Sequence, residues 1–233
     1  SQYLVFTFFI NQNNFRMKRI GILQLLILSL CILLSIPSVL GQAVKTPQAS
    51  PKAALKQMVG LTEVKIVYHR PQVKEREIWG KLVAYNDGKP MPWRAGANDN
   101  TTISFSSAVK VEGKEIAAGT YGIHMIPSKN EATIVFSSNS SSWGSYSYNP
   151  AEDVLRVTVK SESCGHHELL TYDFISYDPQ KGEAVCALSW ADRRIPFKIG
   201  MVDMQKEILT NIGNQLRNTN GFTWQGWNSA ARY

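Results

Sequence analysis

Short segments in which apolar and polar residues alternate constrain the fold of this chain more than any other feature. In the first of them, Val64, Ile66 and Tyr68 fall on one face of an extended chain, and Pro71 ends the pattern. A period of two residues indicates a half-buried β-strand. Further segments of β character cover residues 101–106, 108–112, 120–126, 132–137, 153–160, 166–176, 183–191 and 195–199.

No helical pattern separates these segments, and their breaks carry the residues of tight turns. One break is Glu-Gly-Lys at 112–114, and another is Pro-Ser-Lys-Asn at 127–130. Short strands joined in this way are typical of antiparallel architectures. We therefore predict a mostly β protein, an antiparallel β-sandwich or jelly-roll-like domain followed by a C-terminal helix, and we exclude an α/β sheet.

The predicted helix begins after Asp203, whose side chain can cap the first turn. An apolar residue recurs at every fourth position from Met204 to Leu216, which places these residues on one face of a helix. We expect this face to pack against the sandwich. Residues 222–233 then hold several aromatic residues and no polar tail, which is typical of a chain that continues beyond Tyr233.

Residues 17–41 have the three parts of an export signal peptide. A positively charged start precedes an apolar run over residues 20–34, and Val39 and Gly41 occupy the positions that a signal peptidase reads. We predict cleavage before Gln42 and a mature protein that is secreted or periplasmic.

The alternative is a retained membrane anchor, because the apolar run approaches the roughly 20 residues of a spanning helix. Pro37 and the small residues after it favour cleavage, so we expect no stable membrane span in the mature protein. Residues 1–16 lack a starting Met, and we interpret them as read-through from upstream of the true start. We divide the rest of the chain into three parts: an extended entry segment at 42–60, the β-sandwich at 61–200 and a helical segment at 201–233.

Cleavage leaves two cysteines, Cys164 and Cys186, in an oxidising compartment. The segments at 166–176 and 183–191 predict a hairpin that sets Cys186 beside Phe174. Cys164 then lies about ten residues further along the sheet, on the order of 30 Å away at ~3.3 Å per residue. A disulfide needs Cα atoms within about 7 Å. We therefore predict two separate thiols.

The mature chain carries a modest net charge. Removing Arg16, Lys18 and Arg19 from the 25 basic residues leaves 22, against 18 acidic residues, for a net charge of +4. These charges are scattered singly, whereas a nucleic-acid-binding surface needs a basic stripe to neutralise phosphates. We expect no nucleic-acid partner.

Familiar catalytic motifs are missing from the sequence, including Gly-x-Ser-x-Gly, Cys-x-x-Cys and His-Glu-x-x-His. The nearest metal candidate is Cys-Gly-His-His-Glu at 164–168. Side chains of the adjacent His166 and His167 point to opposite faces of a strand, so they cannot readily share one ion. We expect neither a metal nor a cofactor, and we interpret His124 as a structural or exposed residue of its strand.

Polar side chains among Gly, Pro and aromatic residues are the candidates for a binding site. Arg70 ends a strand, and Arg94 lies in a loop that Gly96 allows to bend closely. Loops at one end of a sandwich usually carry recognition groups, and guanidinium and amide groups suit carboxylates, phosphates or sugars. We predict a pocket for a small anionic or hydroxyl-rich ligand. Its residues are Arg70, Trp93, Arg94, Asn98, Tyr121, Tyr148, Asp153 and Arg156.

An alternative interpretation is that these residues form structural corners. Arginines would then bond loop carbonyls, and tyrosines would cap the core.

The same residues carry a resemblance to a known family. The motifs are Val67-Tyr68-x-Arg70-Pro71, Trp93-Arg94-x-Gly96-Ala97-Asn98, Ala118-Gly119-Thr120-Tyr121-Gly122, Trp143-Gly144 and Asp153-Val154-Leu155-Arg156-Val157. In this order they resemble the bacterial domain-of-unknown-function family 2911 (DUF2911), over residues 48 to 199. The resemblance implies a secreted β-rich protein with no established activity, followed by helical repeats similar to the tetratricopeptide type.

Two departures from the family pattern concern the loops. Glu75 stands where the family usually has Gly, and the stretch from Asn86 to Pro92 is longer than usual before Trp93.

Three functions follow from these observations. The first is a noncatalytic module that binds a small ligand and has a protein partner for its C-terminal helical region. The second is an envelope hydrolase that uses Asp153 or Glu168 beside Arg94, and the third is a structural envelope protein. Because the sequence offers no nucleophile with an activating base, we favour the binding module.

Overall fold

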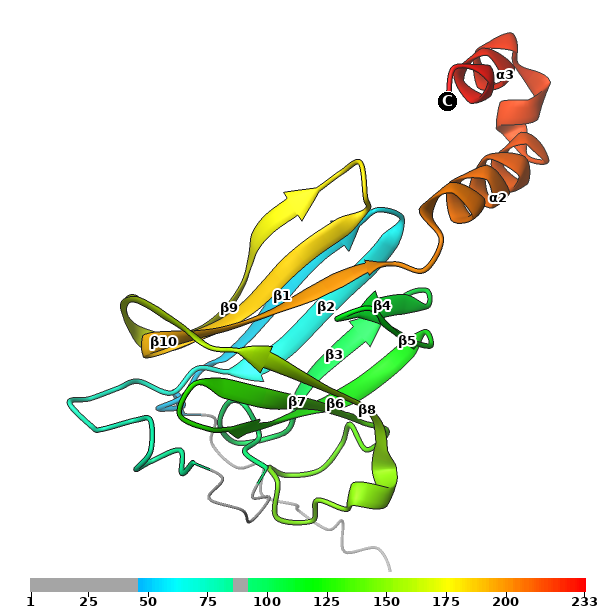
Figure 1. The fold of residues 1–233 in the computed structure, drawn as a ribbon. Helices are drawn as coiled ribbons and strands as arrows, with labels where there is room; N and C mark the ends of the chain where they lie inside the picture. Colours follow the sequence, from blue (N-terminus) through cyan, green and yellow to red (C-terminus); the bar gives the residue numbers. More distant parts are fainter. Residues whose placement is uncertain (1–45, 86–91) are drawn as a thin grey trace, which may run out of the picture. The chain divides into compact units, whose positions relative to one another are not determined.

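The strands of this chain form two antiparallel sheets (Figure 1). The computed structural model describes residues 46–85 and 92–233. The predicted signal peptide at 17–41 and the residues before it lie outside the described residues. The prediction of a mostly β, antiparallel fold with helix at its C-terminal end is confirmed.

The larger sheet has six strands in the order β1-β2-β3-β6-β7-β8. Their bounds are Lys52–Val59 for β1, Thr62–His69 for β2, Thr101–Phe105 for β3, Gly119–Pro127 for β6, Glu131–Ser137 for β7 and Asp153–Lys160 for β8. The smaller sheet has the order β5-β4-β10-β9. Its bounds are Val109–Val111 for β4, Lys114–Ile116 for β5, Glu162–Asp178 for β9 and Glu183–Met201 for β10. Only Ser161 separates β8 from β9, so the chain changes sheets at this point.

The inward faces of the two sheets enclose the core. Ile66, Ile103 and Ile123 of the larger sheet are fully buried, and they belong to one cluster with Leu188 and Phe197 of β10. Burying such a side chain contributes about 1.5–3 kcal/mol relative to leaving it exposed. The alternation seen in the sequence therefore marks the side of each strand that faces the opposite sheet.

The sequence pattern did not indicate two strands, the short β5 and the longer β1. We expected the sandwich to start at residue 61, after an extended segment at 42–60, but residues 52–59 pair along their whole length with β2. The alternation is weak here because Gln57 lies on the half-buried side of the strand and Met58 on the exposed side. The alternating pattern requires an apolar residue on the half-buried side and a polar one on the exposed side. These two residues reverse that order.

The long β9–β10 hairpin has the predicted register, with Cys186 opposite Phe174. Cys164 lies near the other end of β9, and both thiols are free. Cys186 is fully buried, and burial raises the pKa of its thiol. A thiol in this environment is chemically inert.

Two helices follow the sheets, α2 at Met204–Leu216 and α3 at Trp224–Ala231. Asp203 caps α2 as predicted, because its side chain accepts a hydrogen bond from the Lys206 backbone N–H at 3.0 Å. No residue of either helix is buried, so the expectation that one face of α2 packs against the sandwich is wrong. Among the described residues, no helix is long and apolar enough to cross a membrane.

The hairpin register leads us to expect two thiols of unequal reactivity. Under native conditions, buried Cys186 should resist iodoacetamide, and half-buried Cys164 should react faster. After denaturation without reductant, both thiols should react. Mass spectrometry of the labelled protein counts the adducts at these two positions, and an intramolecular bridge between them would contradict the register.

The backbone at Glu75 provides a second test. Lys74 and Glu75 have φ values of 47° and 58°, in the left-handed region that costs a residue with a Cβ about 1–2 kcal/mol. Glu75→Gly should therefore raise the free energy of unfolding by about 1 kcal/mol. Glu77→Gly, at an exposed position without this strain, should lower it by about 0.5–1 kcal/mol. Urea denaturation compares the two, and destabilisation by Glu75→Gly would contradict the strain.

Candidate functional site

Arg70 ties the end of β2 to the neighbouring sheet. Its Nε donates to the carbonyl oxygen of Leu170 at 3.0 Å, and its Nη2 donates to Thr171 Oγ1 at 2.7 Å. Its backbone N–H donates to the Pro51 carbonyl at 3.0 Å. Arg70 thus connects the end of β2 to β9 and to the residue that precedes β1. Arg70 is therefore a structural corner.

Loop 92–100 leads into β3, and its Trp93 extends the pairing with β6 before β3 begins. Trp93 pairs with Met125 of β6 through two backbone hydrogen bonds of 2.7 and 2.8 Å. Gly96 then allows a close approach, since a Cβ at this position would lie 2.6 Å from Thr101 Oγ1. Asn98 has a φ of 57° and reverses the chain. The loop is therefore held against the sheet on both sides of Arg94.

Arg94 joins loop 92–100 to loop 138–149, which connects β7 to β8. Its Nη1 donates to the Asn98 carbonyl at 2.6 Å. Its guanidinium carbon lies 5.0 Å from the ring centroid of Trp143 and 5.4 Å from that of Tyr146. These two rings stack on each other, with planes at 8°. A Cβ at position 144 would lie 2.4 Å from the guanidinium carbon, so Gly144 makes the close contact possible.

Tyr148, Asp153 and Arg156 form a separate network. The Tyr148 hydroxyl and the Arg156 Nε donate to the same oxygen of Asp153, at 2.7 and 2.6 Å, and Arg156 Nη2 donates to the Tyr148 hydroxyl at 2.6 Å. Burial, aided by the hydrogen bond to Asp153, raises the pKa of Tyr148 to about 12. The network spans loop 138–149 and β8, and it leaves the Tyr148 hydroxyl neutral at physiological pH.

The same loop covers the outer face of the larger sheet. His124 of β6 is 3% exposed, its Nδ1 lies 2.7 Å from Ser145 Oγ, and its ring meets the Tyr148 ring edge-on. Burial lowers the pKa of His124, although nearby Asp153 opposes the shift. His124 is a satisfied structural residue, consistent with our interpretation of the sequence.

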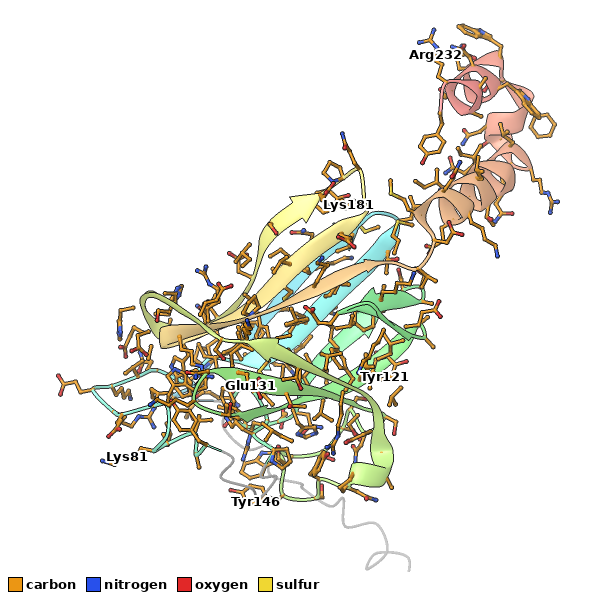
Figure 2. The ribbon with its side chains drawn as sticks, in the orientation of Figure 1. Lys81, Tyr121, Glu131, Tyr146, Lys181 and Arg232 are labelled. Atoms are coloured by element: carbon orange, nitrogen blue, oxygen red, sulfur yellow. The ribbon has the colours of Figure 1, made fainter. Side chains whose placement is uncertain are left out.

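The eight predicted site residues therefore belong to different groups in the structure. Arg94 and Asn98 meet, with Trp93 beside them, whereas Tyr148 belongs to the separate network. Tyr121 is buried elsewhere and donates to the Ala117 carbonyl at 3.0 Å, well apart from Tyr146 (Figure 2). Of the four residues that we expected to converge on one pocket, Arg94 and Asn98 line a common cleft, whereas Arg70 and Tyr148 are not among its described lining residues.

Neither carboxylate of the hydrolase alternative pairs with Arg94, which donates to the Asn98 carbonyl. Asp153 pairs with Arg156. Glu168 accepts from the Lys74 backbone N–H at 3.0 Å, and it pairs with His166 at 3.3 Å. Within residues 46–85 and 92–233, no group of three or more His, Cys, Asp or Glu side chains is placed to hold a metal ion.

Three tryptophans anchor loop 92–100 and the segment at 72–85 on β10. Trp93 stacks on Trp190, with ring centroids 5.9 Å apart and planes at 13°. Trp79 meets both rings edge-on, and its Nε1 donates to the Trp190 carbonyl at 3.0 Å. Trp190 is buried in the core. Members of this cluster contribute to the walls of two clefts.

The first cleft, which we call the Trp93 cleft, has a volume of about 640 Å³. The residues that give it its chemistry are Lys74, Arg76, Trp93, Arg94, Asn98 and Tyr146. Three of these side chains are cationic, and no Asp or Glu is among the described residues that line the cleft. The cleft is therefore positively charged, and it contains three of the predicted site residues.

The second cleft was not predicted from the sequence, and we call it the Arg193 cleft. Its lining includes Trp79, Asn130, Ser161, His166 and Arg193. Arg193 is 7% exposed, and its Nη2 donates to the carbonyls of Ser128 at 2.7 Å and Glu131 at 3.1 Å. Its guanidinium also packs on the Trp79 ring. Nε and Nη1 are buried without an acceptor among the described residues. Arg193 thus serves to fix the β6–β7 turn.

We expect Arg193→Met to be strongly destabilising. The substitution removes the donor from two turn carbonyls and the packing on Trp79, and it should lower the free energy of unfolding by on the order of 2–4 kcal/mol. Arg194→Met, at the next and more exposed position, should cost less than about 1 kcal/mol. Urea denaturation measures both. Equal effects of the two substitutions would contradict the structural role of Arg193.

Burial of His124 predicts a loss of stability in mild acid. Its folded pKa lies below the value of about 6.5 in an unfolded chain, so the unfolded state binds the proton first. Stability is therefore full above this pH and decreases as the pH falls below it. Between pH 7.5 and 5.5, His124→Asn should reduce this decrease, and His167→Asn should leave it unchanged. Identical pH profiles for His124→Asn and the unsubstituted protein would exclude this cause.

Comparison with known proteins agrees with the motifs and the fold. One family matches residues 50–199, and its description is a protein of unknown function (DUF2911). No curated protein and no solved structure matched the chain. Because the match covers both sheets and most of the chain's length, the protein belongs to the DUF2911 family.

Proposed function

We propose that this protein is an exported, noncatalytic module that binds a small anionic ligand in the Trp93 cleft. The observation that carries the proposal is the charge of the cleft. Lys74, Arg76 and Arg94 line it, and no described carboxylate does. Uncompensated positive charge in a concave site attracts anions and raises their local concentration.

The three cations differ in the contacts that they make within the protein. These contacts decide which cation should be substituted to test the proposal. Arg94 also supports loop 138–149, so its removal would change stability as well as charge. Arg76 donates to the backbone carbonyls of Gln72 and Val73. The Lys74 side chain is exposed and makes no hydrogen bond or ion pair within the described residues. Substitution of Lys74 therefore changes the charge of the cleft without removing a side-chain hydrogen bond or ion pair of the described residues.

The predicted signal peptide at 17–41, with predicted cleavage before Gln42, supports a location outside the cytoplasm. The hydrolase alternative has no observation in its favour, because both of its carboxylates are engaged with groups other than Arg94. A binding role needs neither a nucleophile nor a metal.

Thermal unfolding in the presence of citrate, pyrophosphate or acidic oligosaccharides, at constant ionic strength, tests the proposal. We expect at least one anion to raise the unfolding temperature saturably, since a ligand at 100 times its dissociation constant adds about 2.7 kcal/mol of stability. Lys74→Glu should abolish the shift. Lys81→Glu makes the same charge change in the same segment but outside the cleft, and it should preserve the shift. If no anion acts, or if the shift survives Lys74→Glu, the Trp93 cleft is not an anion site.

A further inference from the structure

Tyr146 gives the Trp93 cleft an aromatic surface in addition to its charge. The side chain lines the cleft and is 82% exposed, although its ring stacks on Trp143. Figure 2 shows Tyr146 on the loop below the larger sheet. A large ring left in water at the rim of a cleft is available for contact with a ligand.

Loop 138–149 holds this ring in place through contacts on several sides. Arg94 packs against Tyr146 itself, Ser145 bonds His124, and Tyr148 bonds Asp153. The loop therefore presents the Tyr146 ring without needing to become ordered when a ligand arrives. A pre-ordered surface reduces the entropy cost of binding.

Neutral hydrogen-bonding groups complete the lining. Ser50, Gln72 and Asn98 all border the cleft, and their hydroxyl and amide groups can both donate and accept. Hydroxyl groups of a ligand need partners of this kind. A simple inorganic anion would use the cations alone and would leave the ring and the amides without a role.

We propose that the ligand of the Trp93 cleft is an acidic saccharide. One sugar ring packs its C–H face on the Tyr146 ring, whose face is electron-rich. The sugar carboxylate meets Lys74 and Arg94, and the sugar hydroxyls bond Gln72 and Asn98. This inference rests on the proposed function, since it requires the cleft to bind anions.

Isothermal titration calorimetry with matched ligands tests the inference. Trigalacturonate is compared with galactotriose, which lacks the carboxylates, and with citrate, which carries three carboxylates and no sugar ring. Sialyllactose and lactose form a second acidic and neutral pair. We expect at least one acidic saccharide to bind about tenfold or more tightly than its neutral counterpart and than citrate, a difference equal to about 1.4 kcal/mol.

Substitutions at Tyr146 separate stacking from charge. Tyr146→Ala should weaken binding of the acidic saccharide about fivefold or more and leave citrate binding unchanged, because only the sugar uses the ring. Tyr146→Phe, which keeps the ring, should bind as the unsubstituted protein does. Tyr177→Ala, a substitution of an exposed tyrosine on β9 outside the cleft, is the control and should have no effect.

The outcomes distinguish this inference from the proposed function. If citrate binds as tightly as both acidic saccharides and Tyr146→Ala changes neither affinity, the cleft is an anion site and the saccharide inference is wrong. If neutral sugars bind as tightly as their acidic counterparts, charge plays no part and the inference is also wrong. If none of these ligands binds but pyrophosphate still raises the unfolding temperature, the cleft is an anion site and the saccharide inference is wrong. If no anion binds at all, both proposals fail.

Discussion

The packing of Trp79 and Trp93 on the buried Trp190 is the contact on which the candidate site depends. Trp190 belongs to the core that the two sheets share, so its position is set by the folding of the whole sandwich. Trp93 stacks on it, and Trp79 bonds its carbonyl. The loops that carry these two tryptophans are therefore held in place by contacts with the core. Loops need this kind of support to hold a binding site in one geometry.

Once the loops are anchored, the partners of each cation decide its role. Arg156 is neutralised by Asp153, and Arg70 and Arg193 give their donors to backbone carbonyls and hydroxyls. These three side chains connect strands and turns. Arg94 also bonds a backbone carbonyl, that of Asn98. Lys74 and Arg94 differ in that they border a cleft whose described lining includes no Asp or Glu. The placement of acidic residues, more than the number of basic ones, distinguishes a binding surface from a structural corner.

Local features of the sequence were sufficient to predict the local structure. The alternation of residues indicated most strands, the hairpin turn gave the pairing of Cys186 with Phe174, and Asp203 marked the start of α2. Strand β1 was missed because Gln57 and Met58 disturb its alternation. The predicted α2 packing failed because an apolar face shows that a helix can pack but does not show what it packs against.

The candidate site could be predicted only in part, because its members come together through long-range contacts. Trp93, Arg94 and Asn98 are neighbours in sequence, so their shared loop was visible. Lys74 and Tyr146 reach the same cleft from other loops, and no periodicity or motif reports such a meeting. The Arg193 cleft was missed for the same reason, since its wall includes residues of four separate segments. Tyr121 belongs to one of the family motifs, but its hydroxyl donates to the nearby Ala117 carbonyl.

A titration of the ¹⁵N-labelled protein with trigalacturonate, followed by NMR, tests the central claim most directly because it locates the bound ligand. The account predicts saturable shifts of the backbone amides of Lys74, Arg94, Asn98 and Tyr146 and of the Trp93 indole N–H, with little change elsewhere. Shifts confined to the Arg193 cleft, at Asn130, Ser161 and His166, would contradict it. So would the absence of any saturable shift.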